Sequence, residues 1–171
     1  MAILKLYTYP DNILSQKCEK VAEVNDDIRK LLDDMLETMY ADKGVGLSAP
    51  QIGPAKRTIV VDDKVTEDGV RGPHPLYMVN PEIIKRSEEK FWFNEGCLSV
   101  PGQCAEVERH YAVTVKYLDY NGNEQILEAE DYLAVILQHE TDHLDGILYI
   151  DRISRLKRNM ILKKLKKQSE G

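Results

Sequence analysis

The sequence is short of features that would place the chain in a membrane, outside the cell or in a disulfide scaffold. No apolar run approaches the ~20 residues that a membrane-spanning helix needs, so we expect no membrane segment. The first residues, MAILKLY, lack a basic stretch followed by a long apolar one, which excludes a secretory signal and predicts a cytoplasmic protein. Only Cys18, Cys97 and Cys104 occur, too few and too irregular for a disulfide framework. A cysteine here is therefore a metal ligand, a nucleophile or a core residue.

Length and composition predict one domain over residues 1–171, since 43% of residues are hydrophobic and 30% charged, as is ordinary for a globular protein. The charge is unevenly distributed. Residues 152–171 hold eight Lys/Arg and one acidic residue, whereas residues 1–151 hold 15 basic and 28 acidic residues. We expect 152–171 to form a basic C-terminal helix. It either contacts an anionic partner or presents a solvated face.

The most informative segment is His-Glu-Thr-Asp-His at 139–143, which follows the apolar run 132–137. A helix that is apolar all round is buried, and burying two imidazoles and a carboxylate at its end is costly unless something binds them. On a helix His139 and His143 lie about 6 Å apart along the axis and about 40° around it, so both rings can converge on one metal ion. Glu140 could reach a water on that ion, as in helix-borne metal hydrolases. The alternative is a surface helix whose polar residues face water.

A catalytic metal site usually has three protein ligands and an open position. No His follows His143, and Asp145 points to a different helix face. The better candidate is Cys97, in a strand-and-turn context after an aromatic run. A thiolate with two imidazoles suits Zn²⁺ or Fe²⁺ rather than Mg²⁺ or Ca²⁺. Cys18 and Cys104 have no such partners nearby and are interpreted as ordinary hydrophobic residues.

The remaining pattern predicts an α+β fold in which antiparallel or mixed sheets surround the metal-binding helix, with further helices near both termini. The expected elements are a helix after Asn25 ending near Gly44, an irregular Gly-rich segment 44–53, a strand 58–61, a surface loop 62–75, short strands 76–80 and 83–86 broken at Pro81, a strand 111–117, a hairpin turn at 121–122, a return strand 125–129, the metal helix ending near Gly146, and a last helix 153–167 with Ile153, Leu156, Met160 and Leu165 on one side.

Three segments, GVGLSAPQ (44–51), EGCLS (95–99) and QHETDHL (138–144), resemble the three signature motifs of the peptide deformylase family, in the same order and at fitting separations. The resemblance extends over essentially the whole chain, including a C-terminal helix of the bacterial type. It implies an enzyme that removes the formyl group from the N-terminal formylmethionine of nascent polypeptides and releases formate. It also implies one Fe²⁺ per chain, which Zn²⁺, Ni²⁺ or Co²⁺ can replace.

Carried over by motif position, the resemblance assigns roles to individual residues. Cys97, His139 and His143 would bind the metal, and Glu140 would be the general base and acid. Gln51 and the backbone N–H of Leu98 would hold the formyl oxygen. Without the resemblance, Gln51 is more readily interpreted as a turn residue that bonds its own loop than as a catalytic residue.

Further residues are expected to contact or shape the substrate site because they lie near the motifs. Val45, Val135 and Ile136 could form the walls of a methionine pocket, although ordinary core packing explains them equally well. Gly46 would let the backbone approach an extended peptide that pairs as an added strand. Gly96 and Glu95 adjoin Cys97.

Our hypothesis from motif proximity is that Glu95 orients the site and pairs with Arg109, so Arg109→Ala should damage the site geometry. Ser48 departs from the family pattern, which usually has Ala, and little change is expected from it.

Two other readings stay open at this point. A zinc endopeptidase of the same helix motif would need a ligand downstream of His143, and none is evident. A non-catalytic metal protein would fill the fourth position with another residue, for which His74 and His110 are the candidates. The resemblance further suggests a monomer and a ribosome contact through the basic C-terminal helix, where attraction to RNA phosphate would fit.

Overall fold

The computed structural model describes residues 2–64 and 74–170. Its helices are α1 (Asp26–Ala41), α2 (Asp131–Leu144) and α3 (Arg155–Glu170), with short 3₁₀ turns at Asn12–Ser15, Ala49–Ile52 and Tyr149–Arg152. Its strands are β1 (Gly46–Ser48), β2 (Thr58–Val61), β3 (Leu76–Arg86), β4 (Lys90–Cys97), β5 (Val100–His110), β6 (Ala112–Leu118) and β7 (Glu124–Glu130). Most of the predicted loop 62–75 lies outside the described residues.

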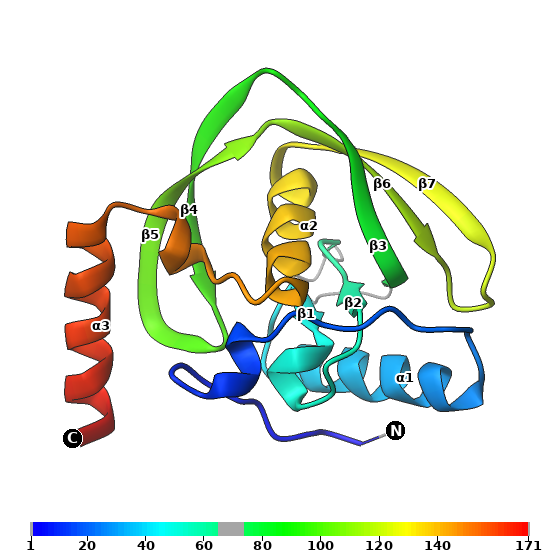
Figure 1. Ribbon diagram of the computed structural model, residues 1–171, viewed down its shortest axis with the longest axis horizontal. Coiled ribbons are helices and arrows are strands. Elements are labelled where there is room, and N and C mark those ends of the chain that lie inside the picture. Colours follow the sequence, from blue (N-terminus) through cyan, green and yellow to red (C-terminus); the bar gives the residue numbers. More distant parts are fainter. Residues whose placement is uncertain (1, 65–73, 171) are drawn as a thin grey trace.

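The strands form two antiparallel sheets that surround α2. One has five strands in the order β1-β2-β3-β6-β7, and the other is the β4-β5 pair. Figure 1 shows α2 in the middle of the molecule, with β4 and β5 on one side, β3, β6 and β7 arching over the other, and α1 below. This arrangement confirms the predicted α+β fold with a central helix. None of the helices in the described part of the chain is long and apolar enough to cross a membrane.

The first predicted helix is confirmed as α1, and the Asn25 side chain caps it by accepting a hydrogen bond from the backbone N–H of Ile28. The expectation for its end needs correction. The residue in the left-handed conformation is Lys43 (φ 57°), not Gly44. Gly44 follows it and closes the helix by donating from its N–H to the Met39 carbonyl. The predicted stop is therefore displaced by one residue.

Two predictions about strands also need correction. The Gly-rich segment 44–53 was expected to be irregular, yet Gly46–Ser48 pairs with β2 before the chain turns into the 3₁₀ helix. Pro81 was expected to separate two strands, but β3 is one strand with a register shift at Val79/Glu82. Asn80 has φ 52° there, and the resulting bulge accommodates Pro81, which has no N–H to donate to a neighbouring strand. Strands β6 and β7 and their hairpin turn at 121–122 are as predicted.

The apolar run before the HETDH segment is buried from Ala134 on, as predicted, whereas Tyr132 at its start is 40% exposed. Ala134, Leu137 and Leu144 are completely inaccessible and pack with residues from both β2 and β6. Gly146 ends the helix with φ 76°, and a Cβ at that position would lie 2.5 Å from the Ser15 carbonyl oxygen. Only glycine satisfies both conditions, so the C-terminal end of α2 is fixed against the N-terminal segment.

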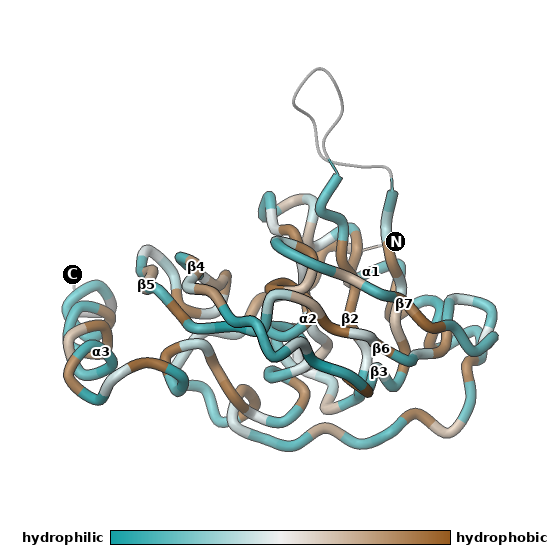
Figure 2. Tube along the Cα trace, turned by 90° about the horizontal axis from the view of Figure 1, so that it is seen from above, coloured by the Kyte–Doolittle hydropathy of each residue, from teal (hydrophilic) through white to brown (hydrophobic). Residues whose placement is uncertain are grey.

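The last helix is present, but the predicted apolar side is wrong. Leu156 and Met160 are 71% and 53% exposed, whereas Ile161 is buried and packs with Tyr149 and strand β5. The helix begins at Arg155 rather than at Ile153, so Ile153 is not part of the apolar side of the helix. Figure 2 shows α3 at the edge of the molecule beside β5. The buried face is consequently narrow, and most of α3 is hydrophilic.

Candidate metal centre and active site

The predicted metal ligands come together at the end of α2. Cys97 is the last residue of β4, and its Sγ lies 3.3 Å from Nε2 of His143, which lies 3.2 Å from Nε2 of His139. These three donor atoms form the only cluster of at least three metal-ligating side chains found among the described residues, all within 4.8 Å of one another. The helical spacing of the two histidines and the β4 turn thus produce the triad that the sequence predicted.

The donor set fits a transition metal. An ion about 2.0–2.3 Å from each nitrogen and sulfur atom holds its ligands a little over 3 Å apart, which agrees with the observed separations. One backbone donor and one side-chain donor also contact the sulfur. The Ser99 backbone nitrogen lies 3.4 Å and Gln51 Nε2 lies 3.6 Å from Cys97 Sγ.

The predicted pairing of Glu95 with Arg109 is present. Arg109 donates from Nε and Nη2 to the two carboxylate oxygens of Glu95, at 2.6 and 2.9 Å, and both side chains are buried. Glu95 Oε1 lies 2.8 Å from His139 Nδ1, so the carboxylate orients the ring whose other nitrogen faces the metal position. Burial alone would raise the pKa of Glu95, but Arg109 and His139 lower it below its usual value.

The hydrogen bonds that hold Glu95 and Arg109 extend to two residues not identified from the sequence, Asp142 and Arg152. Arg109 also donates from Nη1 to Asp142 at 2.8 Å, and Asp142 accepts two further hydrogen bonds from Arg152, at 2.7 and 2.8 Å. Asp142 lies inside the HETDH segment, where its position between the ligands was the available signal. Nothing in the sequence pairs Arg152 with it, because the two meet only after the chain turns back through Tyr149–Arg152.

Glu140 is buried next to the ligands and is only partly satisfied. Its Oε1 has no hydrogen-bond partner among the described residues. Burial raises the pKa of Glu140 to about 7, which suits proton transfer near neutral pH. The carboxylate packs so tightly on Gly46 that a Cβ there would lie 2.6 Å from Oε2. Gly46 thus leaves room for the group that the sequence singled out as the base.

Gln51 combines the two roles that the sequence left open. Its Oε1 accepts hydrogen bonds from the backbone and hydroxyl of Ser48, at 3.0 and 2.9 Å, which is bonding within its own loop. This holds Nε2 toward the metal ligands, where it also donates to Ser99 Oγ at 3.1 Å. The expectation that Ser48 changes little is therefore incomplete, because its hydroxyl adds a hydrogen bond that an alanine could not make.

A cavity of about 340 Å³ opens beside the ligands. Its lining includes Leu98 and all the proposed substrate-contacting residues, which are Val45, Gly46, Glu95, Gly96, Val135 and Ile136. Phe93 and Tyr132 also line it, with their rings stacked at 5.3 Å, although the sequence analysis did not select them. Phe93 stood in the aromatic run before Cys97 and Tyr132 on the first turn of α2, and neither position alone indicated a shared cavity.

The geometry disfavours a closed structural metal site. His110 Nδ1 lies 2.8 Å from the Ser87 carbonyl, and neither His110 nor His74 joins the ligand cluster. Asp145 is also elsewhere, 2.9 Å from Arg57. Three ligands, an adjacent carboxylate and an open cavity are the arrangement of a hydrolytic centre.

Comparison with known proteins agrees with this reading. The sequence profile of the family described as "Polypeptide deformylase" matches residues 3–159. A peptide deformylase from Rickettsia akari is 51% identical over 170 residues, covering 98% of this chain and 97% of the relative. The crystal structure of a peptide deformylase from Ehrlichia chaffeensis in complex with actinonin superposes with a TM-score of 0.91 at 43% identity, covering all of both chains.

A third similar structure is a Met-Ala-Ser-bound peptide deformylase from Acinetobacter baumannii, with a TM-score of 0.83 and 37% identity over 89% of this chain and 99% of that one. Identity at this level over nearly the full length shows the family. The chain therefore belongs to the polypeptide deformylase family.

Proposed function

We propose that this deformylase binds one Fe²⁺ through Cys97, His139 and His143, with Zn²⁺, Ni²⁺ or Co²⁺ able to replace it. The thiolate and two imidazoles suit these ions and do not suit Mg²⁺ or Ca²⁺. When bound, the ion supplies a Lewis acid that polarises a carbonyl and lowers the pKa of water. The reaction is removal of an N-terminal formyl group, with formate as the product.

Glu140 is the general base and then the general acid in this proposal. Its carboxylate accepts a proton from the attacking water and later delivers it to the leaving amine. The observation that carries the assignment is the unpartnered Oε1, buried beside three converging ligand atoms. A carboxylate held only for structure would have its oxygens satisfied, as those of Glu95 are.

Gln51 and the backbone N–H of Leu98 stabilise the oxygen of the formyl group as negative charge develops on it. Gln51 Nε2 is held close to Cys97 Sγ by the contacts of its Oε1 with Ser48, so the donor is positioned before substrate binds. Leu98 lines the same cavity, directly after the ligand Cys97.

The substrate is a nascent chain that begins with formylmethionine. Val45, Val135 and Ile136 supply apolar walls suited to a methionine side chain, and Gly46 and Gly96 leave the backbone accessible. Strand β1 is at the edge of the five-stranded sheet, so an extended peptide can pair with it. The relatives described as bound to Met-Ala-Ser and to actinonin support a peptide-like ligand in this cavity.

The test is formate release from a formyl-Met tripeptide by anaerobically purified, Fe²⁺-loaded protein, with Glu140→Ala as the control. Rapid release that the control lacks would support both the reaction and the base. A folded, metal-loaded sample that releases no formate would contradict the proposal and favour a peptidase or a binding protein.

The chain is further proposed to be one monomeric cytoplasmic domain over 1–171 whose basic helix α3 contacts the ribosome. Support for the contact is the exposure of nearly all the basic residues of 152–171. Exposed Leu156 and Met160 lie on the same helix and could add apolar contact. Ribosome co-sedimentation of the full chain, beside a variant with Lys163 and Lys164 changed to Glu, would test this contact.

A further inference from the structure

A second cavity, larger than the one beside the metal ligands, lies outside the active site. A groove of about 820 Å³ lies along a different face of α2, lined there by Gln138, Thr141, Asp142 and Asp145. Tyr132, Val135, Ile136, His139 and Glu140 line the cavity beside the metal ligands instead. The proposed catalytic groups are absent from the groove lining, so deformylation leaves the groove without a role.

Basic residues are concentrated in this groove. Seven of the 15 Lys/Arg residues of 1–151 line it, whereas only five of the 28 acidic residues do, and Arg152 adds another basic side chain. The part of the chain that carries a large excess of negative charge thus has a positively lined hollow. Such a hollow attracts anions more strongly than a flat surface, because its walls focus the field.

The acidic residues that line the groove are too few to neutralise all of its basic residues. Each acidic side chain in the lining lies close to a basic one. The ion pairs are Lys116–Glu124, Lys90–Glu108, Arg57–Asp145, and Asp142 with both Arg109 and Arg152. Glu82 acts on Lys116, whose pKa rises mainly through Glu124 and to a smaller extent through Glu82.

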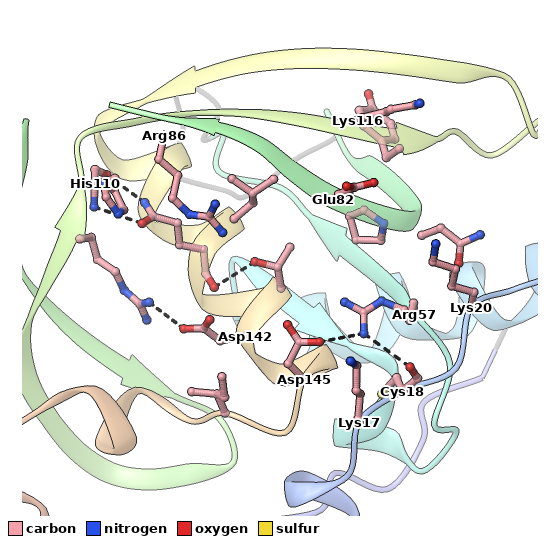
Figure 3. A pocket seen from close by; sticks show the side chains of 18 of the residues that line it. Lys17, Cys18, Lys20, Arg57, Glu82, Arg86, His110, Lys116, Asp142 and Asp145 are labelled. Carbon is pink, nitrogen blue, oxygen red and sulfur yellow. Dashed lines mark hydrogen bonds and ion pairs between the residues drawn. The ribbon is translucent and has the colours of Figure 1, made fainter. Parts of the chain in front are cut away.

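Three cations remain after this pairing. Lys17, Lys20 and Arg86 line the groove without an acidic partner in the ranges 2–64 and 74–170. Figure 3 shows them around one hollow, with Lys17 and Lys20 on the N-terminal segment and Arg86 on β3. Arg57 also lines this hollow. Within the described residues, the hydrogen bonds of its side chain all come from Nη1, which donates to Asp145 and to the carbonyls of Cys18 and Leu144. Its Nε and Nη2 therefore remain as donors.

We propose that this groove binds a small anion with two or more adjacent phosphate groups, held by Lys17, Lys20, Arg57 and Arg86. Guanidinium groups match phosphate oxygens in pairs, and lysines add mobile positive charge. The three unpaired cations match an anion of comparable charge. A small ligand is favoured over a nucleic acid because the cations come from separate segments around a hollow, not along an extended ridge.

The experiment is calorimetric titration of the metal-loaded full chain with inorganic pyrophosphate and, separately, with ADP. Arg86→Glu and Lys20→Glu remove groove cations. Lys85→Glu and Lys56→Glu make the same charge change at exposed positions outside the groove lining, and Lys85 directly precedes Arg86 on β3. Unchanged formate release in all four variants would show that the active site is intact.

The expected result is saturable binding of one anion per chain, weakened at least about tenfold by each groove variant and little by either control. Tighter binding of ADP would identify a nucleotide as the ligand, and equal binding a simple diphosphate.

Three results would overturn the proposal. They are the absence of saturable binding, an equal loss in groove and control variants, and binding that survives both groove changes but disappears when the metal is removed. An RNA oligonucleotide that binds where neither small anion does would likewise replace it with a nucleic-acid surface.

Discussion

The two faces of α2 differ in how their polar groups are satisfied. On the cavity face, Glu140 Oε1 is buried and has no hydrogen-bond partner within the described ranges. On the other face, Gln138 donates to two carbonyls, Thr141 donates to the Leu137 carbonyl, and Asp142 is paired with two arginines. One turn of helix thus carries both unsatisfied and fully satisfied groups.

The difference separates reactive groups from supporting ones. Unpaired buried atoms are costly, so their persistence on one face indicates that substrate, water or metal completes them. Asp142 is connected to the metal site through Arg109 and Glu95, and Glu95 holds the His139 ring in place. Residues on the cavity side should therefore control turnover, and those behind it should control metal binding.

Among substitutions on the cavity face, Glu140→Gln should lower turnover the most. Loss of the base is expected to lower kcat by about 10²–10⁴-fold, since this is the usual contribution of general acid–base catalysis. The substitution keeps the shape of the side chain beside Gly46 and should leave the metal in place. Formate release and metal content measured on the same sample check this. Retained turnover would remove Glu140 from the mechanism.

Gln51→Ala should give the next largest effect, a fall in kcat of about 10²–10³-fold, the usual cost of losing one oxyanion donor. Metal content should change little, because Ser99 N–H still donates to Cys97 Sγ. Steady-state kinetics with formyl-Met peptides would show the loss in kcat. A change confined to KM would mean that Gln51 binds substrate without stabilising the transition state.

Arg109→Ala tests the supporting side. Removing the guanidinium leaves Glu95 buried without its main partner, so metal affinity should fall by about 10–100-fold. Stability should also fall, by about 3–5 kcal/mol, because one member of a buried ion pair is lost. Metal titration and denaturant unfolding measure the two effects. If the variant does not fold, Arg109→Lys keeps the charge but not the paired geometry and replaces it in the titration. Wild-type metal affinity and turnover would contradict the supporting role.

Ser48→Ala should have the smallest effect. It removes one of the two hydrogen bonds that hold Gln51 Oε1, worth about 0.5–1.5 kcal/mol, so kcat should fall between about two- and tenfold. The double variant Ser48→Ala/Gln51→Ala provides the control, because Ser48 should have no further effect once Gln51 is gone. Additive losses in that variant would show that Ser48 acts independently of Gln51.

Local patterns predicted the parts of the molecule that depend on local rules. The spacing of His139 and His143 identified the ligand helix, and Asn25 identified the start of α1. Long-range pairings were predicted only where a motif supplied proximity, as for Glu95 with Arg109. The Asp142–Arg152 pair and the Phe93–Tyr132 wall depend on how separate segments pack, which periodicity does not encode. The same limit explains the wrong face of α3, where contact with β5 selected Ile161 over Leu156 and Met160.

The division between the two faces of α2 is tested most directly by comparing the metal dissociation constants of Glu140→Gln and Arg109→Ala with that of the unaltered chain. We expect Glu140→Gln to bind the metal as the unaltered chain does, and Arg109→Ala to bind it about 10–100-fold more weakly. Loss of metal from Glu140→Gln with full retention by Arg109→Ala would contradict the assignment of reactive groups to one face and supporting groups to the other.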